Sequence, residues 1–263
     1  MSVAETLSDR MKEYEKVTEA RLIKKQPVII RLDGKAFHTF TQGIDKPFDE
    51  DLADAFEFTC IKLKEKVQGA KLIYTQSDEI SILLTDWEKT TTDCWFDYRI
   101  QKVVSIASSL ATCFFNQYID EIVAKYYKKY NQKDISYEEE QLYLKKYQLW
   151  KSKKYKANFD ARIFNLPISE IANYFIYRQK DAIRNSIQSL GQAHFSHKEL
   201  NKKNTSEVIQ MVKDKVSIDF NELSSRQQKG ICLYRDFDTE KWIIDKDIPD
   251  FLANREYIEK YVR

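Results

Sequence analysis

The sequence predicts an α+β protein in which helices pack on an antiparallel, ferredoxin-like sheet. Residues 27–84 have the periodicities of a strand, a helix and two further strands, which is half of a ferredoxin-like sheet. A hydrophobic content of 43% in 263 residues is enough for one substantial core. Strand-like and helix-like segments continue to the end of the sequence without an internal repeat or a flexible linker. A single compact body with helical appendages is therefore expected.

The amino-terminal third supplies the first four elements of this pattern. Residues 5–25 are charged and helix-like as far as Pro27, and residues 27–32 form a strand that ends at Asp33-Gly34. Residues 49–68 form a helix that is acidic at its start and basic near its end, which suits the helix dipole. Two strands at 71–75 and 80–84 then make a hairpin, with Gln76-Ser77-Asp78-Glu79 as its turn. The apolar face of the helix is Leu52, Phe56, Thr59, Leu63 and Val67.

The remaining two thirds are predicted to be mostly helical. We expect an amphipathic helix over about 93–118, a charged and aromatic helical segment over 120–156, and a strand over 157–166 that Pro167 ends. A further helix over 168–190 precedes Gly191. The last elements are a helix near 205–215, a basic turn at 226–230, strands at 231–236 and 241–245, and a C-terminal helix.

Composition excludes several classes of protein. A net charge of +2 with 32% charged residues does not indicate nucleic acid by itself, so any such surface must come from local clustering. The four cysteines form no C-x-x-C pair, which is typical of reduced thiols rather than a zinc site. There is no signal peptide and no apolar run near the roughly 20 residues that span a bilayer, so a cytoplasmic protein without a membrane partner is expected. Neither common glycine-rich phosphate loop is present, so phosphates must be held by metal ions and side chains.

Three carboxylates are predicted to converge at one edge of the sheet. If the first and third strands pair, the end of the first strand places Asp33 opposite the turn that contains Asp78 and Glu79. Such an all-oxygen group suits Mg²⁺, and two ions roughly 3.5–4 Å apart can activate a hydroxyl and stabilise a leaving pyrophosphate. The residues therefore indicate a two-metal nucleotidyl-transfer site. A solvated acidic turn is the alternative that these residues leave open.

A set of motifs follows in order along residues 27–235. They are Arg31-Leu32-Asp33-Gly34-Lys35-Ala36-Phe37-His38, Lys46-Pro47, Gln76-Ser77-Asp78-Glu79, Trp95-Phe96 with Arg99 and Lys102, Phe159-Asp160-Ala161-Arg162, Arg178-Gln179-x-Asp181 and Arg226-x-x-Lys229-Gly230. Each motif alone is weak, but the combination is specific, and it resembles the tRNA-His guanylyltransferase family and its 3′-to-5′ polymerase relatives. The resemblance implies one catalytic unit over 1–263, with a polymerase-like palm over about 27–190 and a C-terminal region over about 191–263.

The resemblance also implies roles for individual positions. Asp33, Asp78 and the carbonyl of Gly34 would bind the metals, and Asp33, Asp78 and Glu79 would be the catalytic acids. The segment Lys35, Ala36, Phe37 and His38, together with Asp33, Gly34, Ser77 and Asp78, would hold a nucleoside triphosphate. Arg31, Lys46, Arg99 and Lys102 would lie near triphosphates and the RNA 5′ end, and RNA would also contact Arg178, Arg184, Arg226 and Lys229.

The implied activity is extension of RNA at its 5′ end, with two Mg²⁺ ions as cofactors and ATP, GTP or other nucleoside triphosphates as substrates. ATP adenylylates a 5′-monophosphate, and the 3′-hydroxyl of an incoming nucleotide then attacks the activated phosphate. Pyrophosphate is finally removed from the new end. The implied macromolecular partner is tRNA, and the implied assembly is a homo-oligomer, a tetramer built as a dimer of dimers.

One motif departs from the guanylyltransferases proper, which carry H-I-N-N-L-Y-N after the R-Q-x-D element. Here the chain reads Arg178-Gln179-Lys180-Asp181-Ala182-Ile183-Arg184-Asn185-Ser186, with no histidine and only Asn185 retained. This resembles the bacterial and archaeal Thg-like branch, which repairs truncated tRNA 5′ ends by copying the opposite strand. We therefore expect template-dependent repair, with addition of G at position −1 of tRNA-His as the alternative.

A second departure is a basic helical insertion over about 120–156. Its last twelve residues hold six lysines, three aromatics and no acid, which suits phosphate contact and base stacking. We expect Lys151, Lys153 and Lys154 to bind RNA, although a solvated helix whose aromatics pack on a partner helix would have the same composition. Two other functions also remain open at this point, a nucleotide cyclase with a similar palm and a catalytically inactive RNA-binding protein.

Overall fold

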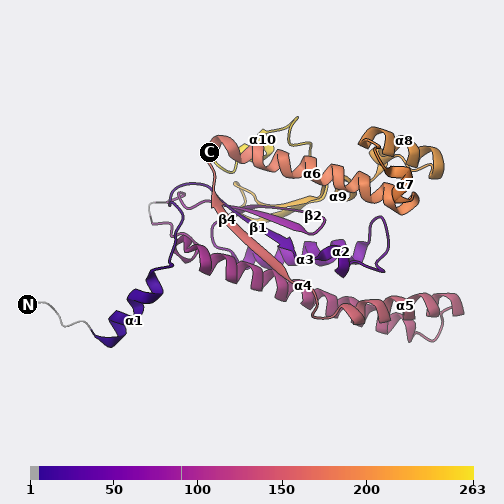
Figure 1. Ribbon diagram of the computed structural model, residues 1–263, viewed down its shortest axis with the longest axis horizontal. Helices are drawn as coiled ribbons and strands as arrows, with labels where there is room; N and C mark the ends of the chain where they lie inside the picture. Colours follow the sequence, from indigo (N-terminus) through magenta and orange to yellow (C-terminus); the bar gives the residue numbers. More distant parts are fainter. Residues whose placement is uncertain (1–5, 90) are drawn as a thin grey trace, which may run out of the picture.

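A six-stranded antiparallel sheet forms the centre of the computed structural model, which describes residues 6–89 and 91–263 (Figure 1). The strand order is β4-β1-β3-β2-β5-β6, and every neighbouring pair is antiparallel. The two-residue link between β2 and β3 makes the predicted hairpin. The strands are β1 (Val28–Gly34), β2 (Ala70–Gln76), β3 (Glu79–Leu84), β4 (Phe159–Asn165), β5 (Ile231–Arg235) and β6 (Trp242–Asp245).

Helices cover both faces of this sheet. The chain order β1-α3-β2-β3-α4-β4 is the β-α-β-β-α-β pattern of a ferredoxin-like fold, which confirms the predicted fold class. The helices are α1 (Leu7–Lys16), α2 (Phe37–Phe40), α3 (Glu50–Lys66), α4 (Ile100–Tyr130), α5 (Tyr137–Lys153), α6 (Ile168–His194), α7 (His197–Leu200), α8 (Thr205–Val216), α9 (Ser225–Lys229) and α10 (Glu256–Glu259), with short 3₁₀ turns η1 (Trp95–Tyr98) and η2 (Phe220–Glu222).

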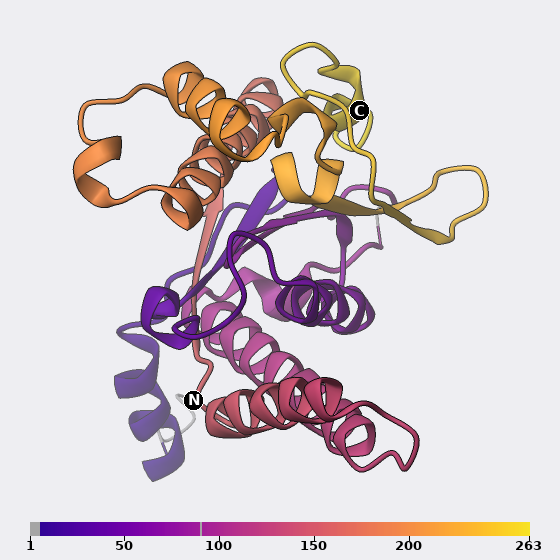
Figure 2. The same ribbon diagram turned by 90° about the vertical axis from the view of Figure 1, so that its right-hand side faces the viewer.

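Alternation along β1 divides the core into two layers. Val28, Ile30 and Leu32 are buried with α3 and α4 on one face, whereas Ile29 is buried with α6 and the C-terminal segment on the other. Figure 2 shows α6 and the sheet above α3 and α4. Because successive side chains of a strand point to opposite faces, Arg31 and Asp33 share the α6 face with Ile29.

A cluster of five phenylalanines fixes the loop that follows β1. Phe115 of α4 has ring centroids 4.9–5.8 Å from those of Phe37, Phe40, Phe56 and Phe159. A Cβ atom at Gly34 would lie only 2.3 Å from the ring of Phe37. The lack of a side chain at this position therefore lets the chain turn back and bury Phe37 directly after the strand ends.

Three predicted helices have different bounds in the structure. The helix predicted over 5–25 ends at Lys16, because the chain beyond it bonds to other segments: Leu22 N–H donates to Tyr98 O and Lys25 N–H to the carboxylate of Asp86. The helix predicted over about 93–118 begins only at Ile100, after η1, and continues as α4 to Tyr130. The C-terminal helix shortens to the four residues of α10.

The predicted helical insertion is an antiparallel pair formed by the end of α4 and by α5, which extends beyond the sheet (Figure 1). Tyr147 of α5 packs against Tyr127 and Tyr130 of α4, and Trp150 is buried in the main core. These aromatic side chains therefore join the two helices, as in the packing alternative. Within the described residues, no helix is both long and apolar enough to cross a membrane.

We expect Phe115→Ala to lower the free energy of unfolding by about 3–5 kcal/mol, because it removes the ring at the centre of the phenylalanine cluster. Urea unfolding monitored by circular dichroism measures the change. Tyr137→Ala is the matched control, since its ring is 71% exposed and its loss should change stability by less than about 0.5 kcal/mol. Equal effects of the two substitutions would contradict the assigned core.

Candidate active site

The hairpin turn lies directly beside the end of β1. Asp33 pairs with Glu79 across β1 and β3, and the N–H of Gly34 donates to the carbonyl of Asp78 at 2.9 Å. Ser77 has a φ of +49°, a left-handed conformation that costs a non-glycine residue on the order of 1 kcal/mol. Such strain is tolerated where surrounding bonds fix the backbone, as they do here.

Asp33 and Asp78 form a pair of acids, of which Asp33 is partly neutralised by an arginine. Burial raises the pKa of Asp78 above its ordinary value, and the negative charge of Asp33 raises it further. The hydroxyl of Ser77 donates to Asp78 Oδ1 at 3.2 Å. Asp33 accepts from Arg31 Nη2 at 2.9 Å. The turn therefore concentrates negative charge at the carboxyl end of β1.

Glu79 does not join these two acids as a third free carboxylate. Its buried side chain makes a two-point ion pair with Arg178 of α6, in which Arg178 Nε lies 2.6 Å from Glu79 Oε1. Arg31 Nε lies 3.0 Å from Glu79 Oε2. The prediction of three converging metal-binding carboxylates was wrong for Glu79, because two guanidinium groups already neutralise it.

The four charges form one continuous network from α6 to β1. Arg178 holds Glu79, Glu79 holds Arg31, and Arg31 holds Asp33. Burial raises the pKa of Glu79, and the two arginines oppose that rise. In this arrangement Glu79 acts on Asp33 through Arg31, which fixes the direction of the Asp33 carboxylate.

The remaining oxygen donors fit Mg²⁺ better than a softer metal. In the described part of the chain no three His, Cys, Asp or Glu side chains gather as a metal-binding group. Mg²⁺ is commonly held by one or two carboxylates, with waters and substrate phosphates completing its shell. Asp33, Asp78 and the carbonyl of Gly34 satisfy that requirement, and the close negative charges of the two acids favour a cation.

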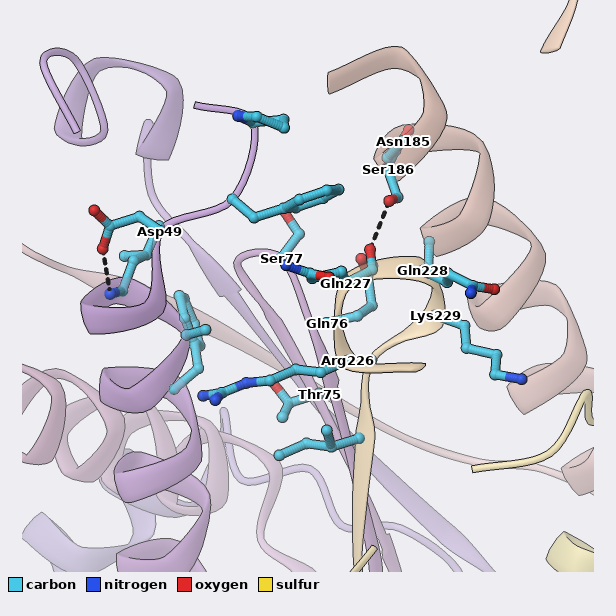
Figure 3. A pocket seen from close by; sticks show the side chains of 18 of the residues that line it. Asp49, Thr75, Gln76, Ser77, Asn185, Ser186, Arg226, Gln227, Gln228 and Lys229 are labelled. Atoms are coloured by element: carbon cyan, nitrogen blue, oxygen red, sulfur yellow. Dashed lines mark hydrogen bonds between the residues drawn. The ribbon is translucent and has the colours of Figure 1, made fainter. Parts of the chain in front are cut away.

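A cavity of about 180 Å³ opens beside the same turn (Figure 3). It lies between the start of α3, the second half of α6 and the junction of α9 with β5. At that junction, a Cβ atom on Gly230 would lie 2.4 Å from Thr75 O, so only glycine fits. The polar lining includes Asp49, Gln76, Ser77, Asn185, Ser186, Arg226, Gln227, Gln228 and Lys229.

The predicted nucleotide segment divides into buried and accessible residues. The side chain of Phe37 is buried in the phenylalanine cluster, and the contact of this segment with nucleotide stays a prediction. Lys35, Ala36 and His38 are exposed. Ser77 is exposed and lines the cavity, so it is the predicted nucleotide contact that the structure brings to a concave surface.

The predicted group of basic residues near the RNA 5′ end does not converge within one chain. Arg31 lies beside Asp33, and Lys46 is exposed in the loop before α3. The backbone of Arg99 instead forms an isolated β-bridge with Arg21, and Leu22 N–H donates to the carbonyl of Tyr98. Both contacts involve the segment that leads into β1. Arg99 and Lys102, at the start of α4, are therefore separated from Asp33 by the length of β1, about 20 Å.

The predicted RNA-binding residues occupy different environments. Lys153 is only 7% exposed and donates to Phe40 O and Gln42 O, so most of its side chain is buried rather than free on the surface. Arg178 is equally buried in its ion pair with Glu79. Lys151 is exposed, and Lys229 lines the cavity. Lys154 forms an ion pair with Asp120, and the exposed Arg184 forms one with Asp181. Arg226 contacts three acids of α3, which are Glu50, Asp54 and Glu57.

Two further charged residues join the site through β4. Asp160 pairs with Asp33, and Arg162 pairs with Arg31. Both side chains alternate onto the face that carries the acidic pair. The spacing Asp160-x-Arg162 mirrors Arg31-x-Asp33 in an antiparallel partner, a signal that becomes readable only once β4 is known to flank β1.

We expect Glu79→Gln to destabilise the protein by about 3–5 kcal/mol, because the buried guanidinium group of Arg178 and the partly buried one of Arg31 lose their shared carboxylate. Glu140→Gln, at an exposed position on α5, is the control. The double variant Glu79→Gln/Arg178→Gln should lose less stability than the sum of the single variants. Additive losses in urea unfolding would show that the pair is not coupled.

Comparisons with known proteins agree with this geometry. The family described as Thg1, tRNAHis guanylyltransferase, matches residues 8–167. A bacterial tRNA(HIS) guanylyltransferase (Thg1)-like protein in complex with ATP is 40% identical, with a TM-score of 0.82 over 98% of this chain and 99% of that one. Its counterpart in complex with GTP is 38% identical, with a TM-score of 0.73 over the same shares.

A curated relative gives the same family from sequence. The tRNA(His) guanylyltransferase of Schizosaccharomyces pombe is 31% identical over 115 residues, which cover 43% of this chain and 41% of that protein. The family match covers more than half of the sequence and includes β1, the hairpin turn and β4. The chain therefore belongs to the tRNA-His guanylyltransferase family and is a 3′-to-5′ nucleotidyltransferase of that family.

Proposed function

We propose that this enzyme repairs truncated tRNA by adding nucleotides to the 5′ end, with the opposite strand as template. The observation that carries the proposal is the pair Asp33 and Asp78, held side by side by the bond from Gly34 N–H to Asp78 O. Two acids at a sheet edge, next to a cavity that reaches Ser77, can bind the metal-bound phosphates of a nucleotide.

In this proposal Asp33, Asp78 and the Gly34 carbonyl hold two Mg²⁺ ions, and Glu79 keeps Asp33 in place through Arg31. Bound Mg²⁺ would stabilise negative charge on the phosphates and favour the deprotonated form of the attacking hydroxyl. Ser77 with Lys35 and its exposed neighbours would orient the triphosphate. ATP would serve to activate the 5′ phosphate, and GTP or another nucleoside triphosphate would be added.

The departure after Arg178-Gln179 supports the repair branch over addition of G to tRNA-His. Ala182, Asn185 and Ser186 of that stretch line the cavity, and Ser186 Oγ donates to Gln227 O at 2.6 Å. The substituted positions Ala182 and Ser186, and the retained Asn185, would therefore lie where a substrate contacts them. The bacterial Thg1-like protein is 40% identical to this chain, whereas the tRNA(His) guanylyltransferase of Saccharomyces cerevisiae is 20% identical with a TM-score of 0.62 and shares the fold.

An oligomeric enzyme would also account for the separation of Arg99 and Lys102 from Asp33. If all the predicted basic residues contact one RNA end, a second copy of the chain must supply those two. We therefore propose that the chain works as a homo-oligomer, a tetramer in the form of a dimer of dimers.

Incubation with 5′-labelled truncated tRNA, Mg²⁺, ATP and GTP should give products longer by one or more nucleotides. Asp78→Ala should reduce the rate at least 100-fold, in the range for loss of a group that stabilises transition-state charge, on the order of 3 kcal/mol or more. Asp134→Ala, in the loop between α4 and α5, should retain the wild-type rate. Product formation that survives Asp78→Ala would contradict the assigned site.

Template dependence can be measured with a panel of truncated tRNAs that differ in the base opposite the missing position. We expect the added nucleotide to be the Watson–Crick partner of that base in every tRNA. Addition of G alone, to tRNA-His alone, would instead support the guanylyltransferase alternative.

A further inference from the structure

A second concave surface, which we call the lysine hollow, lies between the loop after β1 and the segment that joins α5 to β4. It has a volume of about 390 Å³, and its polar lining is Lys35, Thr39, Ser152, Lys153, Lys156 and Asn158. No carboxylate lines it. A concave surface with three ammonium groups and no acid is complementary to an anion.

The three lysines of the hollow lack acidic partners among the residues that the structure describes. Lys35 and Lys156 are exposed, and neither forms an ion pair with a described residue. Lys153 uses two of its three donors on the carbonyls of Phe40 and Gln42, which leaves a third donor in the lining. Burial lowers the pKa of Lys153, and the positive charge of Lys156 lowers it further, as expected for cations that lack an anion.

Hydrogen bonds fix the walls of the hollow. Lys153 joins the end of α5 to the backbone after α2, and Lys35 N–H donates to Asn158 O at 2.9 Å. Asn116 of α4 donates to Ala157 O at 2.9 Å, which fixes the chain just before β4. The backbone that lines the hollow and the ammonium group of Lys153 are therefore fixed before any ligand arrives, which reduces the entropy lost on binding.

The lysine hollow lies next to the acidic pair along the chain. Lys35 follows Asp33 by two residues, so their Cα atoms are at most about 7 Å apart. β4 is the edge strand of the sheet, and Asp160 and Arg162 on it are exposed. A substrate that crosses this open edge to reach Asp33 would place its neighbouring groups over the hollow.

We propose that the lysine hollow binds a phosphate group of the substrates, with Lys35 and Lys156 as the ion-pairing residues and the hydroxyls of Thr39 and Ser152 as hydrogen-bond donors. The phosphate can come from the RNA backbone next to the 5′ end or from a nucleoside triphosphate. This inference rests on the proposed function only for the choice of RNA and a nucleoside triphosphate as the ligands to be tested.

The test compares Lys156→Gln with Lys145→Gln, an exposed lysine of α5 outside the hollow. Lys156 is chosen because its exposed side chain makes no bond that the fold requires, whereas loss of Lys153 would leave two carbonyls unpaired. The dissociation constants of truncated tRNA and of ATP are measured separately, without turnover, at several salt concentrations. Binding can then succeed or fail independently of whether the enzyme extends tRNA.

We expect Lys156→Gln to weaken binding of one probe about fivefold and to reduce its salt slope by about one, as for loss of one phosphate contact. Weaker tRNA binding assigns the phosphate to RNA, and weaker ATP binding assigns it to the nucleotide. Unchanged binding of both probes, or an equal loss in Lys145→Gln, would overturn the proposal.

Discussion

The pairing register of β1 with its two neighbours is the constraint on which the active site depends. A shift of one residue would move Arg31 and Asp33 to the face that packs on α3 and α4, and would move Leu32 away from it. The buried residues Val28, Ile30 and Leu32 prevent this, because they would have to leave the core. The hydrophobic core therefore fixes the position of the acids as firmly as any polar contact does.

Within the ion network, the neighbouring acids Asp78 and Glu79 differ in how far their charge is neutralised. Asp78 is left with its negative charge largely unbalanced, whereas Glu79 is neutralised by two arginines. A buried charge is tolerated only when it is paired with an opposite charge. For Glu79 that partner is Arg178 of α6, which lies 99 residues later in the sequence. The two adjacent carboxylates therefore differ: Asp78 would bind metal in the proposed mechanism, whereas Glu79 stabilises the fold through its ion pairs.

Local pattern was sufficient to predict the strands and the hairpin turn, because apolar alternation and a two-residue link depend only on residues that are close in the sequence. It was also sufficient for the helix face Phe56, Thr59, Leu63 and Val67, all of which are buried. It did not reveal the buried contacts of Lys153 and Arg178, whose partners lie about 100 residues away in the sequence. It failed for Arg99 as well, because motif order does not reveal at which end of the sheet a helix begins.

The helical pair α4 and α5 has a consequence for how such chains can change in length. α4 has 31 residues and is about 46 Å long, roughly twice the length of a seven-residue strand. α5 runs back along it and ends at Lys153, which is bonded to the loop after β1. The two helices are joined by the loop over 131–136. An insertion or deletion there can therefore lengthen or shorten both helices by one turn each. The distal tip is therefore free to diversify during evolution while the catalytic end keeps its shape.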